Sequence, residues 1–124
     1  MTTPSNAPYP RTDLSQADLS GAELSEVLLI GANLSRVNFS RANLSWSCLR
    51  GSHLSGANLT GANLTGANLT GADLSGADLY GADLTKANLT GANLIEANLF
   101  GADLTDANLT GAILPESYLE IGPK

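Results

Sequence analysis

The sequence is governed by a five-residue period. Residues 56–80 read GANLT GANLT GANLT GADLS GADLY, and leucine recurs at every fifth position from Leu14 to Leu119, with Phe39 as the single substitute. A helix turns through about 500° in five residues, so these leucines would spiral around it. In a flat strand an odd spacing would put successive leucines on opposite faces. The period therefore predicts a chain that turns a corner in every repeat and winds into a solenoid with leucine inside.

The other positions of the repeat fit this interpretation. The small residue two positions before leucine can also point inward and let the backbone close around the core. The residue just before leucine is Asn ten times and Asp six times, which suits corners because both bond to nearby main chain. The fifth residue is Gly in twelve repeats, which supplies positive φ without steric cost. The predicted core includes Phe39, Leu59, Leu64, Leu69, Leu74, Leu79, Leu84 and Leu89.

The phrase A(D/N)LXX, repeated without a break over residues 12–121, resembles the pentapeptide-repeat family. That resemblance implies an all-β fold, a right-handed quadrilateral parallel β-helix with four pentapeptides in each coil and about five and a half coils. The period alone predicts corners, and the number of sides comes from the family. We expect residues 1–11 to be a flexible proline-rich tail and residues 122–124 a C-terminal tail. Such simple tandem arrays are abundant in cyanobacteria, as the resemblance implies.

Charge and composition exclude several classes of partner. The formal net charge of −6 disfavours binding to the phosphate backbone of nucleic acids. No apolar run is long enough for a membrane span, and the N-terminus lacks the hydrophobic core of a signal peptide. We therefore expect a cytoplasmic protein with neither a nucleic-acid nor a membrane partner.

The sequence does not bring metal-binding or catalytic side chains together at one place. Cys48 and His53 are the kinds of residue that bind metals or act as nucleophiles, but a five-residue spacing places them on different sides of a coil, without a second Cys or His. Asp73, Asp78 and Asp83 likewise step around three sides rather than gathering as calcium ligands. We predict no catalytic residue, no metal, no cofactor and no enzymatic activity.

The outward positions carry a few large side chains. Tyr80 and Phe100 are twenty residues apart, so they should stack on adjacent coils. Apolar residues cluster around position 28, and Trp46 should lie one coil above Glu26. This cluster has two interpretations, namely local surface packing and a protein-contact patch. The candidate contact surface comprises Leu28, Ile30, Trp46, Arg50, Tyr80 and Phe100.

The end of the chain departs from the repeat. Ile113, Tyr118 and Ile121 stand where Asn, Asp and Gly stood in earlier repeats. The last coil has no successor, so its edge must be covered or paired. We expect either a short irregular cap or an end-to-end homodimer interface, because the chain after Leu119 is too short for a capping helix.

Two functions fit these features. The first is a non-catalytic structural scaffold that binds a protein partner. The second follows from the resemblance, because some members of that family are acidic rods that resemble duplex DNA, bind DNA gyrase and other type II topoisomerases, and protect or inhibit them. Residues 73–120, with eight acids and one base, agree with the second alternative.

Overall fold

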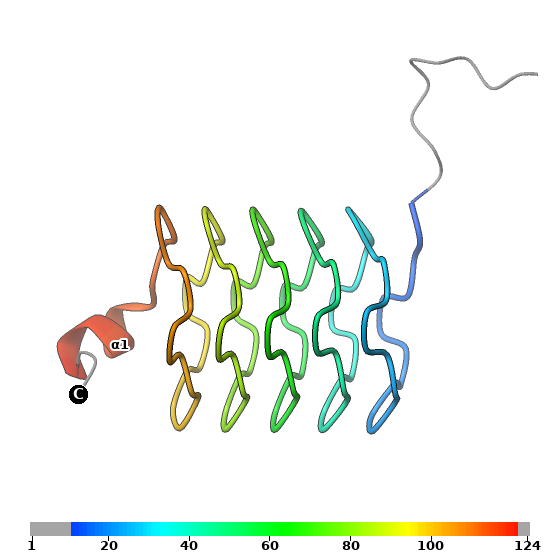
Figure 1. Cartoon of the computed structure of the whole chain (residues 1–124), viewed down its shortest axis with the longest axis horizontal. Helices are drawn as coiled ribbons and strands as arrows, with labels where there is room; N and C mark the ends of the chain where they lie inside the picture. The colour runs from blue at the N-terminus through cyan, green and yellow to red at the C-terminus, as the bar shows by residue number, and fades with distance from the viewer. Residues whose placement is uncertain (1–10, 122–124) are drawn as a thin grey trace, which may run out of the picture.

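The computed structural model describes residues 11–121, and the chain up to Leu114 winds into a rod of stacked coils (Figure 1). Parallel bridges join each residue before a core leucine to the residue twenty positions later, from Asp13 with Asn33 to Asn93 with Ile113. Twenty residues are four pentapeptides, so the predicted quadrilateral β-helix is confirmed. Each side of a coil contributes a single bridged residue. Within the described part of the chain, the named elements therefore reduce to one helix, α1 (Glu116–Ile121).

A regular pentapeptide in the middle of the rod satisfies all five of its backbone amides. In the repeat 67–71, the amides of Leu69 and Gly71 donate to the next coil at 2.7 and 2.9 Å, and that of Asn68 donates to the preceding coil at 2.9 Å. The amide of Ala67 closes a turn on the carbonyl of the leucine three residues earlier, at 3.0 Å. The fifth amide, from Thr70, donates to Oδ1 of Asn68 at 3.0 Å. No backbone donor of the repeat is left without an acceptor, as a compact fold requires.

This pattern corrects the predicted role of Asn and Asp. These residues bond to nearby main chain as expected, but they lie in the middle of each side, where they form the bridges, and not at the corners. The corner is formed by the fourth and fifth residues, and the positive φ expected at the fifth position is present. It occurs at glycines such as Gly66 (φ 68°) and also at side-chain-bearing residues such as Trp46 (φ 59°) and Lys86 (φ 63°).

The core is the predicted spine. Leucines from Leu29 to Leu99 are buried, Phe39 is fully buried among them, and the alanines of the same repeats pack beside them. All eight predicted core residues are confirmed as buried. Towards the ends of the rod the spine is only half-buried, because no further coil of residues 11–121 covers it. The half-buried leucines are Leu14, Leu19, Leu24, Leu104, Leu109 and Leu114.

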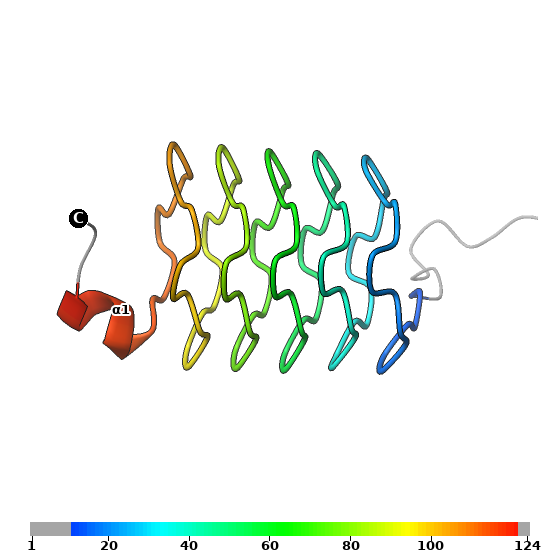
Figure 2. The ribbon, with the colours of Figure 1, turned by 90° about the horizontal axis from the view of Figure 1, so that it is seen from below.

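The predicted C-terminal bound of the β-helix is wrong, because residues 116–121 form α1 and not a coil. Figures 1 and 2 show α1 beyond the last coil, at the end of the rod. Pro115 has no amide to donate to a ladder and favours the start of a helix. Its carbonyl accepts hydrogen bonds from the amides of Tyr118 and Leu119 at 3.1 and 3.2 Å. The sequence predicted no capping helix because it counted only the residues after Leu119, whereas α1 begins at Glu116, three residues earlier.

The two predicted tails fall almost entirely outside the described residues. Of residues 1–11 the structure describes only Arg11, and residues 122–124 are not described. Within residues 11–121, no helix has the length and apolar character that crossing a membrane requires.

Candidate protein-interaction surfaces

An apolar patch covers one side of the rod near its N-terminal end. Leu28, Ile30 and Trp46 expose 74%, 58% and 58% of their surfaces. Cys48 is bridged to Leu28, so the two residues lie on the same side of the rod on neighbouring coils. We call Leu28, Ile30, Trp46 and Cys48 the tryptophan patch. Large exposed apolar side chains on neighbouring coils of one side are typical of protein-contact surfaces.

The tryptophan patch gives up hydrogen bonds that most repeats make. Leu28 and Cys48 stand where Asn or Asp would cap the amide two residues later, and the amides of Ile30 and Arg50 have no hydrogen-bond acceptor among the described residues. In the same coil, the buried hydroxyl of Ser47 also has no partner within that part of the chain. At these positions the sequence therefore lacks the capping side chains that the backbone of the repeat needs.

Trp46 is held in a fixed position over the next coil. Trp46 has a φ of 59°, a backbone conformation that a bulky L-residue rarely adopts. A Cβ atom added to Gly66, twenty residues later, would overlap ring atoms of Trp46, so the indole lies directly against this glycine. The side chain of Arg36 lies over Gly56 in the same way, with Cγ 3.3 Å from where a Cβ would stand. Side chains at the fifth position thus lean over the next coil where glycine leaves room.

The surroundings of the tryptophan patch are basic. Arg50 shares its side of the coil, and Arg41 lies one corner away along the chain. Arg11 donates a hydrogen bond to Nε2 of His53 at 3.2 Å, next to the following corner. Glu26 is the one acidic residue of the two repeats that carry the patch, 26–30 and 46–50. The patch therefore combines exposed apolar area with nearby guanidinium groups.

A second exposed apolar group is the aromatic pair, Tyr80 and Phe100. Their ring centroids are 5.8 Å apart and their planes differ by 12°, which confirms the predicted stacking. Oδ1 of Asp78 accepts hydrogen bonds from the amide of Tyr80 at 3.0 Å and from Nδ2 of Asn98 at 3.2 Å. Oδ1 of Asn98 in turn accepts the amide of Phe100 at 3.0 Å. The side chains of Asp78 and Asn98 therefore fix the backbone of both aromatic residues. The role of the pair as a contact surface stays a prediction.

Carboxylates surround the aromatic pair. Asp83 and Asp103 are bridged to each other on the side of the coil that follows the pair. The hydroxyl of Thr105 donates to Oδ1 of Asp103 at 2.6 Å and its amide at 3.0 Å, and these bonds hold the pKa of Asp103 below its ordinary value of 3.8. The same arrangement lowers the pKa of Asp13, mainly through the amide of Ser15, and of Asp18, mainly through the hydroxyl of Ser20.

These capping bonds predict a pH dependence of stability. A carboxyl whose folded-state pKa is lowered contributes stability that is present above its unfolded pKa and is lost as the pH falls through the folded value. We therefore expect the free energy of unfolding, measured by urea titration, to decrease between about pH 5 and about pH 2. The triple variant Asp13→Asn/Asp18→Asn/Asp103→Asn should show a flatter profile, because Asn makes the same caps elsewhere in the rod without titrating. An unchanged slope in this variant would contradict the assignment.

The residues considered for chemistry do not converge. Cys48 and His53 occupy different sides of one coil, as their separate bridges to Leu28 and Asn33 show. Asp73, Asp78 and Asp83 likewise belong to three different columns of bridges. Among residues 11–121, no three His, Cys, Asp or Glu side chains are grouped as metal ligands.

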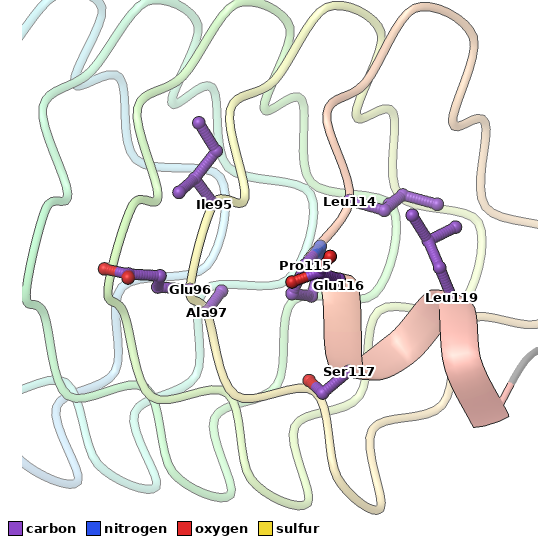
Figure 3. A pocket seen from close by; sticks show the side chains of 8 residues that line it. All are labelled: Ile95, Glu96, Ala97, Leu114, Pro115, Glu116, Ser117 and Leu119. Atoms are coloured by element: carbon purple, nitrogen blue, oxygen red, sulfur yellow. The ribbon is translucent and has the colours of Figure 1, made fainter.

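The C-terminal end carries a shallow groove between the last coil and α1, with a volume of about 580 Å³ (Figure 3). Figure 3 shows the carboxylate of Glu96 directed away from Glu116, as expected for like charges. Tyr118 packs against the core, so it is partly withdrawn from the predicted end-to-end interface, whereas Ile113 is 52% exposed. The side chain of Ile121 is outside the described part. The groove is lined by Ile95, Glu96, Ala97, Leu114, Pro115, Glu116, Ser117 and Leu119.

The coil geometry defines a β-helical solenoid, and comparison with known sequences defines its family. The family model "Pentapeptide repeats" matches residues 11–45, 38–76 and 77–114. The chain belongs to the pentapeptide-repeat family, whose fold is a right-handed quadrilateral β-helix. Curated proteins include no sequence that matches the chain.

Two solved structures, Rfr23 and HetL, show the same architecture. The pentapeptide repeat protein Rfr23 from the cyanobacterium Cyanothece 51142 is 30% identical over 84% of this chain and 88% of its own, with a TM-score of 0.72. HetL from the cyanobacterium Nostoc, described as involved in heterocyst differentiation regulation, is 34% identical over 84% of this chain, with a TM-score of 0.50. The chain spans 60% of the length of HetL. A pentapeptide repeat protein from the Arabidopsis thaliana thylakoid lumen is 36% identical over 87% and 72% of the two chains, with a TM-score of 0.48.

Proposed function

We propose that this protein is a non-catalytic scaffold that binds a protein partner through the tryptophan patch. The observation that carries the proposal is Trp46, an exposed tryptophan held at positive φ over a glycine that leaves room for it. Tryptophan and arginine are enriched among the residues that dominate binding energy at interfaces. Both types occur here, at the two ends of one side of the coil: Trp46 at the corner before Cys48 and Arg50 at the corner after it.

The departures from the repeat support this proposal. Residues that break the local preferences of a fold tend to lie at functional sites, because stability alone would select against them. At positions 28, 46 and 48 the repeat prefers Asn, Gly and Asn, and the chain instead carries Leu, Trp and Cys. Leu28 and Trp46 add exposed apolar surface, although Leu28 removes a capping bond and Trp46 requires an unfavourable backbone angle. Cys48, which is half-buried, removes a second capping bond. Binding of a partner would explain why these three residues depart from the repeat, whereas the stability of the fold does not explain it.

Restoring the consensus provides a test that separates binding from folding. The variant Leu28→Asn/Trp46→Gly regains the cap and removes the strained residue, so we expect its free energy of unfolding to equal or exceed that of the wild type. In affinity capture followed by quantitative mass spectrometry, it should retain less than about a tenth of the specifically bound protein, as removal of a central interface anchor predicts. A matched control is Thr70→Ser, a conservative change at a half-buried position in the same column of the rod as Arg50. Equal capture by the wild type and the double variant would refute the proposal.

The alternative is an acidic rod that mimics duplex DNA and binds DNA gyrase. Its support is the charge of residues 73–120, whereas Asp73, Asp78 and Asp83 lie on three different sides of the coil. A gyrase supercoiling assay with and without a quinolone distinguishes the two functions. As a scaffold, the protein should neither inhibit nor protect gyrase at micromolar concentration. The cytoplasmic location predicted from the sequence remains part of this proposal.

A further inference from the structure

We propose that the groove between the last coil and α1, here called the C-terminal groove, binds an extended segment of a partner protein that carries apolar residues and a lysine or arginine. The bound segment pairs its backbone with the open edge of the last coil. This inference goes beyond the proposed function, because the C-terminal groove lies at the other end of the rod from repeats 26–30 and 46–50 and contains no residue of the tryptophan patch (Figures 1 and 3).

The backbone edge of the last coil is unpaired beside the C-terminal groove. One coil earlier, the amides of Gly76 and Leu79 each donate to the next coil at 2.8 Å. The equivalent amides of the last coil, those of Glu96 and Leu99, have no hydrogen-bond acceptor among residues 11–121. Within the same range, the carbonyl of Ala97 accepts no hydrogen bond. Two donors and one acceptor on this side of the coil can therefore pair with one further strand.

The ladder stops here because the chain enters α1. In the earlier coils, the acceptor for the amide of the fifth residue is the carbonyl nineteen positions later, which for Glu96 would be that of Pro115. This carbonyl instead accepts the amides of Tyr118 and Leu119 at 3.1 and 3.2 Å. The last bridged residue of this side is consequently Asn98. An open strand edge of this kind is where extended peptides add to a sheet.

The lining of the C-terminal groove indicates the side chains that a partner needs. Ile95 and Leu119 expose 45% and 61% of their surfaces, and Leu114 adds a half-buried apolar wall. Glu96 contributes a carboxylate from the last coil and Glu116 one from α1, while no basic residue of the described chain lines the groove. Apolar residues of an extended segment can therefore cover the aliphatic side chains, and a lysine or arginine can complement the carboxylates.

Charge disfavours a second copy as the occupant of the C-terminal groove. The first coil of another copy could in principle extend the ladder, but three of its sides carry Asp13, Asp18 and Glu23. Two C-terminal ends that met face to face would bring Glu96 and Glu116 of both copies together. Like charges brought into close contact cost free energy. A basic segment of a different protein avoids both conflicts, so the end-to-end homodimer predicted from the sequence becomes the competing outcome.

Selection from a phage-displayed library of random nine-residue peptides on the full chain tests the inference. We expect the enriched peptides to combine lysine or arginine with β-branched or aromatic residues, which favour extended backbone. Fluorescence anisotropy with one enriched peptide, labelled with fluorescein, then gives its Kd for each variant. The Kd should rise by at least about tenfold in Glu96→Gln/Glu116→Gln and in Ile95→Thr, which restores a residue common at this position of the repeat.

The matched control is Asp106→Asn, which removes an exposed carboxylate at the diagonally opposite corner of the same coil and should leave the Kd unchanged. Trp46→Gly should leave it unchanged as well, so this test and the capture through the tryptophan patch can fail independently. Circular dichroism and urea unfolding establish that each variant is folded. The inference would be overturned if no peptide were enriched, or if the enriched peptides bound the glutamate variant as tightly as the wild type.

Methylation of the peptide's own amides tests the backbone pairing. Only one edge of an extended segment can face the last coil, so N-methylation at alternate positions should raise the Kd by at least about tenfold, whereas methylation at the intervening positions should be tolerated. Equal tolerance at all positions would contradict the pairing. Light scattering of the chain without peptide provides the remaining outcome, because a homodimer that Ile95→Thr dissociates would assign the C-terminal groove to a second copy and overturn the inference.

Discussion

Replacing Leu69 by alanine is expected to lower the free energy of unfolding by about 2 to 5 kcal/mol. Leu69 is fully buried in the middle of the spine, with coils on both sides of it. Truncation removes the transfer free energy of its side chain and leaves a cavity that the rigid ladder cannot close. The coils also depend on one another, because each gains its stability from contact with its neighbours. Urea unfolding followed by circular dichroism measures the change.

The matched variant is Leu14→Ala. Leu14 occupies the same position of the repeat but is only half-buried, because no described coil precedes it. Its truncation removes less buried area, so we expect a clearly smaller loss of stability than at Leu69. Equal losses at the two positions would show that the N-terminal end is covered as completely as the centre.

The second large effect is expected at Gly66. Alanine there must adopt a φ near 68°, which costs about 1 to 2 kcal/mol for an L-residue. Its Cβ would in addition overlap the ring of Trp46, and forcing the indole away adds about 1 to 3 kcal/mol. Gly71→Ala is the control, because Gly71 has the same φ and nothing lies within 4 Å of its Cβ position. We expect Gly66→Ala to lower the free energy of unfolding more than Gly71→Ala does.

A double-mutant cycle isolates the contact with the indole. In the background of Trp46→Gly, the substitution Gly66→Ala should cost no more than Gly71→Ala, because only the backbone strain remains. Thermal unfolding of six proteins is sufficient for the comparison, namely the wild type, Gly66→Ala and Gly71→Ala, each with and without Trp46→Gly. If the difference between the two glycines persists without Trp46, the indole does not lie against Gly66.

Much of the fold follows from the five-residue period. The spacing of the leucines excludes a helix and a flat sheet, which leaves a coil with a filled centre, and the structure buries the predicted spine from Leu29 to Leu99. The position of the corner was harder to predict, because Asn and Asp favour corners and also cap amides. Only the backbone hydrogen bonds show which role applies. The helix α1 was missed because leucine keeps its period to Leu119, although Pro115 carried a signal against another coil.

The candidate surfaces could be predicted in part. The exposed residues of both surfaces were recognised as departures from the repeat, and the twenty-residue coil predicted the stacking of Tyr80 on Phe100. The contact of Trp46 with Gly66 was not predicted, although the two residues are also twenty apart. The direction in which a side chain leans depends on its backbone angle, and the sequence does not reveal that angle when the residue is not glycine.

The satisfaction of all five amides within a regular repeat has a consequence for how such a rod can evolve. Since most repeats make the same caps and ladder bonds, the coil is nearly unchanged by a shift of twenty residues along the chain. Equivalent outward positions therefore recur at every coil. The same cluster of outward side chains could be placed one or more coils away without a change in the backbone. A chain of this kind can acquire, move or lose a recognition surface by point substitution alone.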